Sequence, residues 1–197
     1  MTTGLFGGAF DPPHNGHVAL AHAALERLSL PVLVVLVVEA PAHKQVAVDA
    51  RIRKRLADAA FPDFDVELDP HPYTVETLDS RRWADPVVLI GADQFAEFLS
   101  WKDPDGVLAR ARLGVATRPG YSRERFEPVL AALRRPERVE LFEIEPVPIS
   151  SSEVRERVSR GEPISGLVPT AVAELIAALG LYRGSESPGD GRGLPLD

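Results

Sequence analysis

The chain has 197 residues, 45% of them apolar, which suffices for one domain with a sizeable core but not for two ordinary domains. With 22 basic against 29 acidic residues its net charge is −7, so it lacks the cationic surface with which proteins neutralise nucleic-acid phosphates. The absence of cysteine excludes disulfides, thiolate catalysis and cysteine-ligated zinc.

Membrane and export signals are also missing from the sequence. No apolar stretch approaches the roughly 18 residues that span a bilayer, and residues 1–10 lack the basic start and long apolar middle of a signal peptide. We therefore expect a cytoplasmic protein that binds neither membrane nor nucleic acid. The densest basic cluster, residues 51–55, favours a solvated helix face over a rim that attracts an anionic ligand.

Short runs rich in β-branched residues alternate with helical patterns along the chain. The runs predict strands at residues 4–6, 32–38, 64–68, 87–90, 113–117 and 139–143. Residues 32–38 are all valine or leucine, and a run that is apolar on both faces is typical of a central parallel strand covered by helices.

Helices are predicted from Asn15 to about Leu28 and over residues 50–61, 75–83, 94–101, 124–133, 151–160 and 170–179. This alternation predicts a single α/β domain over residues 1–183, with a doubly wound, mostly parallel, Rossmann-like sheet and helices on both faces. In such sheets ligands bind beyond the carboxyl ends of the strands, where the strand order reverses.

Two signals bound the end of this domain. Ser150 can cap the helix that follows it, with Glu153 as its capping-box partner and Ile149 spaced to pack against Val154 across the cap. Residues 184–197 contain glycine and proline with almost nothing to bury, which predicts a disordered tail.

The segment of residues 7–17, GGAFDPPHNGH, follows the first predicted strand and opens the first helix. The glycine pair lets the backbone pass close to a ligand, and Asn15 is a good N-cap. His14 and His17 lie three residues apart around the first turn, where free N–H groups of the helix attract anions. This arrangement indicates a phosphate site.

Other interpretations of the segment are weaker. Neither G-x-x-x-x-G-K-[ST] nor G-x-G-x-x-G is present. The histidines could be ordinary surface or cap residues, but their spacing after a glycine pair favours function. A two-histidine metal site has only Asp11 nearby as a third ligand.

Residues 7–17 resemble the signature of the HxGH nucleotidylyltransferase superfamily. From Gly4 to about Leu181 the chain is similar to one of its families, the bacterial nicotinate-mononucleotide adenylyltransferases. The matching pieces are PAHK at residues 41–44, YTVETL at 73–78, GAD at 91–93, WK at 101–102, RPG at 118–120 and ISSSEVR at 149–155. The YTxxTL, WK and RPG pieces, in that order, make the match to this family specific.

The resemblance implies an ATP site and a set of catalytic residues. Catalysis falls to His14, His17, Lys44 and Arg155. ATP would contact Gly7, Gly8, Ala9, Phe10, His14, His17, Gly91, Asp93, Ile149, Ser151, Ser152 and Arg155. The arginine fork suits phosphate oxygens, and Asp93 could accept hydrogen bonds from a ribose or cap a helix.

The resemblance also implies an acceptor site formed by His43, Lys44, Tyr73, Thr74, Trp101 and Arg118. Thr74 would hold the carboxylate of the acceptor at a helix start, and Trp101 would stack on its ring or lie half-buried in the core. The family usually has two adjacent prolines before the His-Lys pair, whereas this chain has Pro41–Ala42, which bears on the rigidity of the loop.

The implied reaction is in-line attack by the phosphate of nicotinate mononucleotide on the α-phosphorus of ATP, with Mg²⁺ bound to the triphosphate and no metal held by the protein alone. The same chemistry on nicotinamide mononucleotide or phosphopantetheine is the nearest alternative. A non-catalytic nucleotide sensor and a plain metal-binding or scaffold protein are alternatives from other classes.

Overall fold

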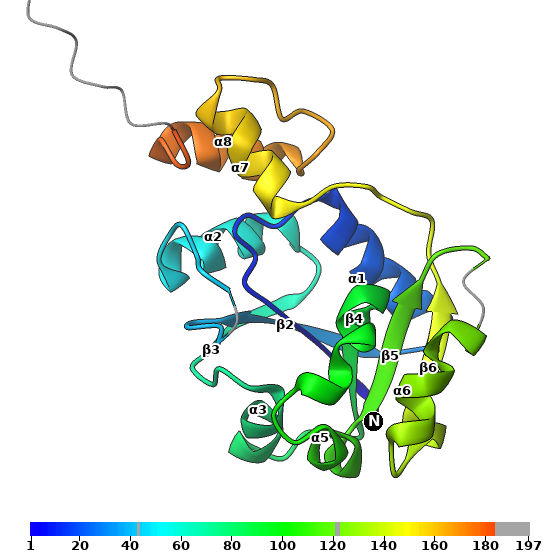
Figure 1. The fold of residues 1–197 in the computed structure, drawn as a ribbon. Coiled ribbons are helices and arrows are strands. Elements are labelled where there is room, and N and C mark those ends of the chain that lie inside the picture. Colours follow the sequence, from blue (N-terminus) through cyan, green and yellow to red (C-terminus); the bar gives the residue numbers. More distant parts are fainter. Residues whose placement is uncertain (43, 121–122, 184–197) are drawn as a thin grey trace, which may run out of the picture.

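The computed structural model describes residues 1–42, 44–120 and 123–183 of the chain. They form an all-parallel sheet of six strands in the order β3-β2-β1-β4-β5-β6 (Figure 1). The strands are β1 (Thr3–Gly8), β2 (Val32–Val38), β3 (Asp65–Asp69), β4 (Pro86–Gly91), β5 (Arg112–Thr117) and β6 (Val139–Glu143). Every predicted strand is confirmed, and so is the doubly wound parallel sheet.

Helices cover both faces of this sheet (Figure 1). One core includes residues of α1 (Asn15–Arg27), α2 (Ala50–Ala60), α7 (Ser151–Ser159) and α8 (Thr170–Leu179). The core on the other side includes residues of α3 (Thr74–Ser80), α4 (Ala92–Ala96), α5 (Pro104–Arg110) and α6 (Glu127–Ala132). None of the helices in the described part of the chain has the length and apolar character to cross a membrane.

Strand β2 shows why its sequence is apolar throughout. Leu33, Val35 and Val37 belong to the core on the α1 side, whereas Val34 and Leu36 belong to the core on the α3 side. Because successive side chains of a strand point to opposite faces, a central strand needs apolar residues at every position. The prediction of a central parallel strand is confirmed.

The region after β4 differs from the prediction. The expected helix over residues 94–101 is the short helix α4 followed by a 3-10 turn, Phe98–Ser100. Helix α5 was not predicted, although Asp103 caps it by accepting a hydrogen bond from the Gly106 amide and Pro104 occupies its first turn. Seven residues are too few to show a clear helical period, so only this cap signal could have indicated it.

The basic cluster at residues 51–55 is not a uniformly solvated face. Arg51 and Arg55 are exposed, but Arg53 is fully buried. Its guanidinium donates to four carbonyl oxygens: Ala9 at 2.7 Å, Val38 at 2.9 Å, Glu39 at 2.7 Å and Val48 at 3.1 Å. The solvated interpretation is wrong for Arg53, which joins the segments that follow β1 and β2.

The two central strands part toward their carboxyl ends. Strand β1 pairs with β2 from Thr3 to Gly8, but with β4 only from Thr3 to Leu5. Beyond Leu5 the carboxyl-terminal halves of β1 and β4 leave a crevice. The strand order reverses between β1 and β4, so this crevice lies where open α/β sheets bind their ligands.

Candidate active site

A cavity of about 470 Å³ occupies the crevice between β1 and β4. Its walls come from the carboxyl ends of β1, β2, β3 and β4, from the start of α3 and from residues 94–102. The polar and glycine residues that line it are Gly7, Gly8, Lys44, Asp69, His71, Tyr73, Thr74, Thr77, Gln94, Glu97, Ser100, Trp101 and Lys102. Its position is the one expected from the sheet topology.

The glycine pair lies inside β1 and has two different uses. A Cβ added at Gly7 would meet no atom within 4 Å, so this residue leaves the cavity wall open. A Cβ at Gly8 would lie 2.9 Å from the Phe10 ring, so this residue makes room for a core side chain. The left-handed backbone falls at Phe10, whose φ is 49°, and not at either glycine.

The first helix begins one residue earlier than a cap at Asn15 would place it. His14 is the N-cap of α1, and Asn15 is its first residue. The Asn15 amide donates to the Leu167 carbonyl at 2.9 Å and its side chain donates to the Gly166 carbonyl at 2.8 Å. The prediction of an Asn15 cap is therefore wrong, because this side chain binds the loop between α7 and α8.

His14 and His17 come together as a stacked pair. Their ring centroids are 3.7 Å apart, with 28° between the planes. A Cβ added at Gly16 would lie 3.1 Å from the His14 ring, so a glycine between the two histidines lets that ring pack. The backbone N–H of His14 donates to Nδ1 of His17 at 3.2 Å, so a neutral His17 ring carries its proton on Nε2 and can donate from there.

Both imidazoles are neutral at pH 7. Burial, with the charge of Lys44, lowers the pKa of His14 to about 4, although Glu153 opposes the shift. Burial, followed by His14 and Lys44, lowers the pKa of His17 well below its ordinary value. Lys44 therefore lies in electrostatic reach of both rings and Glu153 in reach of His14, and an uncharged imidazole can still donate one hydrogen bond.

The histidine pair lies beside the cavity and outside its lining. The His17 ring packs edge-on against Phe10 at 5.2 Å between centroids. His14 is 8% exposed, and its Nδ1 is buried without a hydrogen-bond partner among the described residues. His17 is half-buried as a residue, and burial is the largest cause of the lowered pKa of its ring.

The start of α7 is capped as predicted, with one difference. The Ser150 hydroxyl accepts a hydrogen bond from the Glu153 amide at 3.1 Å. Val154 is fully buried, and Ile149 packs against the same core. The Glu153 carboxylate pairs with Arg157 at 3.0 Å and not with the backbone amide of Ser150. The second hydrogen bond of the predicted capping box is therefore wrong.

The same helix start docks on the loop that carries the histidines. The Ser151 hydroxyl donates to the Pro12 carbonyl at 2.8 Å. Arg155 donates to the Asp11 carbonyl at 2.6 Å and to the Ser152 hydroxyl at 3.2 Å. These contacts bring the predicted triphosphate residues of α7 beside the start of α1, from the opposite end of the sequence.

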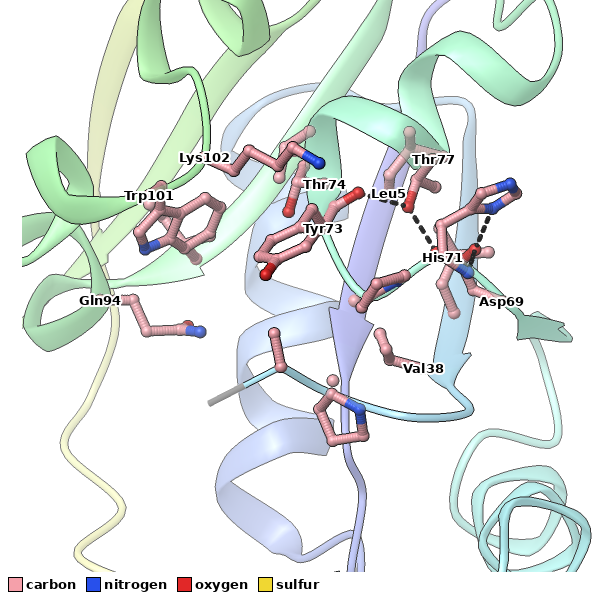
Figure 2. Close-up of a pocket in the computed structure, with 18 of the residues that line it drawn as sticks. Leu5, Val38, Asp69, His71, Tyr73, Thr74, Thr77, Gln94, Trp101 and Lys102 are labelled. Atoms are coloured by element: carbon pink, nitrogen blue, oxygen red, sulfur yellow. Dashed lines mark hydrogen bonds and ion pairs between the residues drawn. The ribbon is translucent and has the colours of Figure 1, made fainter. Parts of the chain in front are cut away.

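Predicted acceptor residues gather at the cavity (Figure 2). Tyr73, Thr74 and Trp101 all line it. Trp101 is half-buried and packs edge-on against Phe98 at 5.2 Å, so it belongs to the core and to the cavity wall at once. The ammonium of Lys102 lies 4.5 Å from the centre of the Tyr73 ring and bonds to Glu76 at 2.6 Å.

Three further polar residues that line the cavity, Asp69, His71 and Thr77, were missed (Figure 2). The buried Asp69 carboxylate accepts hydrogen bonds from the Thr77 hydroxyl at 2.6 Å and from the His71 amide at 3.0 Å, and it contacts His71 Nδ1 at 2.8 Å. Asp69 directly follows the predicted strand 64–68, and a polar residue at that position was the available signal.

Other predicted site residues lie apart from the cavity. Arg118 is exposed after β5 and is not part of the lining. Asp93 is exposed in the first turn of α4, whose N-cap is Gly91, so its interpretation as an N-cap is wrong. The Phe10 side chain is buried in the core, which leaves only its backbone for a ligand. His43 and the predicted tail, 184–197, lie outside the described residues.

Asp11, the third ligand that a metal site at the two histidines would need, is engaged in other contacts. The Asp11 carboxylate accepts hydrogen bonds from the Ala47 amide and the Tyr182 hydroxyl and is 3% exposed. Among the described residues, no three histidine, aspartate or glutamate side chains gather in a way that could hold a metal ion. The geometry instead offers N–H and cationic donors, which suit an anion.

Comparison with known proteins shows similarity over almost the whole chain. A family model described as cytidylyltransferase-like matches residues 5–157. A protein of Moorella thermoacetica is 38% identical over 91% of both chains, and one of Thermus thermophilus is 38% identical over 93% of this chain and 100% of its own. Both are named "probable nicotinate-nucleotide adenylyltransferase".

Solved structures share the fold at low sequence identity. The Plasmodium falciparum nicotinic acid mononucleotide adenylyltransferase complexed with NaAD superposes with a TM-score of 0.73 at 15% identity, covering 92% of this chain and 97% of that one. The same enzyme complexed with APC gives a TM-score of 0.69 at 16% identity, covering 92% and 96%.

Proposed function

Since the chain belongs to the cytidylyltransferase-like family and is a nucleotidyltransferase of the nicotinate-nucleotide adenylyltransferase type, we propose that it joins the AMP part of ATP to nicotinate mononucleotide. The products are nicotinate adenine dinucleotide, an intermediate of NAD biosynthesis, and pyrophosphate. Cytoplasmic location and the lack of nucleic-acid and membrane partners stay predictions.

One observation carries the proposal. The crevice between β1 and β4 joins a cavity lined by aromatic side chains to a helix start that carries two neutral histidines. Lys44 lines the cavity and lies in electrostatic reach of both histidines. A mononucleotide in the cavity can thereby present its phosphate to a triphosphate at the helix start. Positioning of this kind accounts for much of the catalysis of phosphoryl transfer.

The acceptor is assigned from the cavity wall. Trp101 offers a flat face for a pyridine ring, and Thr74 offers a hydroxyl at the start of α3. A carboxylate suits such a position better than a neutral carboxamide. These features support nicotinate mononucleotide over its amide, and they have no partner in phosphopantetheine, which lacks both the ring and the acid group.

The chemistry needs no covalent intermediate. The acceptor phosphate is anionic at neutral pH, attacks the α-phosphorus in line and displaces pyrophosphate. His17 donates from Nε2 to a phosphate oxygen, and Lys44 supplies positive charge. Arg155 has five N–H donors, and its bonds to the Asp11 carbonyl and the Ser152 hydroxyl leave others for the triphosphate.

Mg²⁺ is proposed to bind with ATP. The described residues form no acidic cluster for a resident metal, so its ligands are phosphate oxygens, whose charge it would offset. Glu153 lies in electrostatic reach of His14, where its charge opposes the lowering of the pKa.

Pyrophosphate release with three acceptors tests the proposal. With ATP and Mg²⁺, we expect kcat/KM to be highest for nicotinate mononucleotide, lower for nicotinamide mononucleotide and undetectable for phosphopantetheine. A preference for either of the other acceptors overturns the assignment. Tight ATP binding without pyrophosphate release from any acceptor establishes the sensor alternative.

A further inference from the structure

Five hydrogen bonds join the C-terminal part of the described chain to residues 9–17, which we call the histidine loop. Residues of α7 supply the bonds from Ser151 and Arg155 to the carbonyls of Pro12 and Asp11. The loop between α7 and α8 accepts two hydrogen bonds from Asn15, through Leu167 and Gly166. The fifth contact comes after α8, where the Tyr182 hydroxyl donates to Asp11 Oδ1 at 2.7 Å.

The Asp11 carboxylate is the centre of this arrangement. Its Oδ1 binds Tyr182, and its Oδ2 accepts the amide of Ala47, which lies three residues after Lys44. With 3% exposure, this carboxylate has little access to solvent and depends on these two donors. One side chain therefore joins the loop that carries the histidines, the segment that follows Lys44 and the segment that follows α8.

The backbone of Tyr182 supports a specific role for its hydroxyl. Its φ is 60°, in the left-handed region that a bulky residue adopts only when its surroundings hold it there. Burial and the Asp11 carboxylate raise the pKa of Tyr182, so the hydroxyl keeps its proton and donates.

We propose that Tyr182 is a positioning residue for nucleotidyl transfer: its hydroxyl fixes the Asp11 carboxylate and thereby places Arg155 and the Lys44 segment around the histidine pair. This inference rests on the proposed function. Tyr182 acts through Asp11, whose carbonyl orients Arg155 and whose side chain binds Ala47. It contacts no reacting atom in this account, so its loss should change turnover more than acceptor affinity.

Tyr182→Phe tests the role, because it removes the hydroxyl and keeps the ring. We expect kcat to fall roughly tenfold, as for a small misplacement of reacting groups, with KM for nicotinate mononucleotide changed less than about twofold. Thr2→Val is the matched control. It removes a 2.8 Å hydroxyl–carboxylate bond to Asp85 at the amino-terminal end of the sheet and should leave both constants unchanged.

Hydrogen–deuterium exchange provides a readout that does not depend on the reaction. In Tyr182→Phe, peptides that contain the Ala47 and Asn15 amides should exchange at least about threefold faster, with no such change in Thr2→Val. Unchanged exchange and unchanged kcat overturn the role of Tyr182. If the wild type releases no pyrophosphate, the proposed function fails, and exchange alone decides whether Tyr182 holds the loop.

Discussion

At the start of α1, each residue of the histidine motif has a separate physical task. The His14 amide fixes the tautomer of His17, and Gly16 leaves room for the His14 ring. Gly8 does the same for Phe10, against which His17 packs. The motif therefore sets the orientation and protonation of one donor, Nε2 of His17.

His17→Ala should lower kcat by roughly 10²–10³, about 3–4 kcal/mol, because it removes a donor to the charge that develops on phosphate. Steady-state pyrophosphate release measures the effect. His22→Ala is the control, since His22 is exposed on the same helix. Equal losses in the two variants would mean that His17 supports the helix and not the reaction.

Stability should fall in mild acid because of the histidine pair. The folded pKa of His14 is about 4, below its ordinary 6.5, so between these values the unfolded chain binds more protons. The free energy of unfolding should thus decrease as pH falls through this window, by about 2 kcal/mol between pH 7 and pH 5 from His14 alone. Urea unfolding of the wild type and His14→Gln measures it, and an equally steep loss in the variant would contradict this origin.

The two glycines of β1 should respond oppositely to an added methyl group. Gly7→Ala places it in the open cavity, so the thermal midpoint should hold while KM for the acceptor rises. Gly8→Ala places it against the Phe10 ring, so the thermal midpoint should drop. Thermal unfolding and kinetics on both variants separate the roles, and a destabilised Gly7→Ala variant would contradict the assignment.

Among the elements, α2 is joined to the segments around the site by one side chain. Arg53 is buried and satisfies carbonyls that follow β1 and β2. Arg53→Met should cost about 3 kcal/mol or more, because those carbonyls are left without a charged donor. Arg55→Met, at an exposed position of the same helix, should change stability by less than about 0.5 kcal/mol. Equal urea midpoints for the two variants would show that the buried guanidinium is dispensable.

The strands could be predicted from the sequence more completely than the short helices. Strands were predictable because buried parallel strands are apolar on both faces, as β2 shows. Residues 94–110 were not, because α4 and α5 are each shorter than two full turns. Arg53 looks like its neighbours in the sequence, and only the packing of α2 on the sheet distinguishes it.

At the scale of the molecule, the sequence indicated the ingredients of the site but not their distances. It predicted the histidine pair, Lys44 and Arg155 separately, and the fold brings the segments that carry them together around Asp11. Such long-range contacts leave no periodic signal in the sequence. The role of Arg118 stays a prediction, since this side chain is exposed and does not line the cavity.

The structure of the protein with nicotinate adenine dinucleotide is the most direct test of the account. We predict the nicotinate ring in the cavity against Trp101, its phosphates over Gly7 and Gly8, and Nε2 of His17 within hydrogen-bond distance of a phosphate oxygen. A dinucleotide that leaves the crevice between β1 and β4 empty, or whose phosphates do not reach His17, would contradict the central claim.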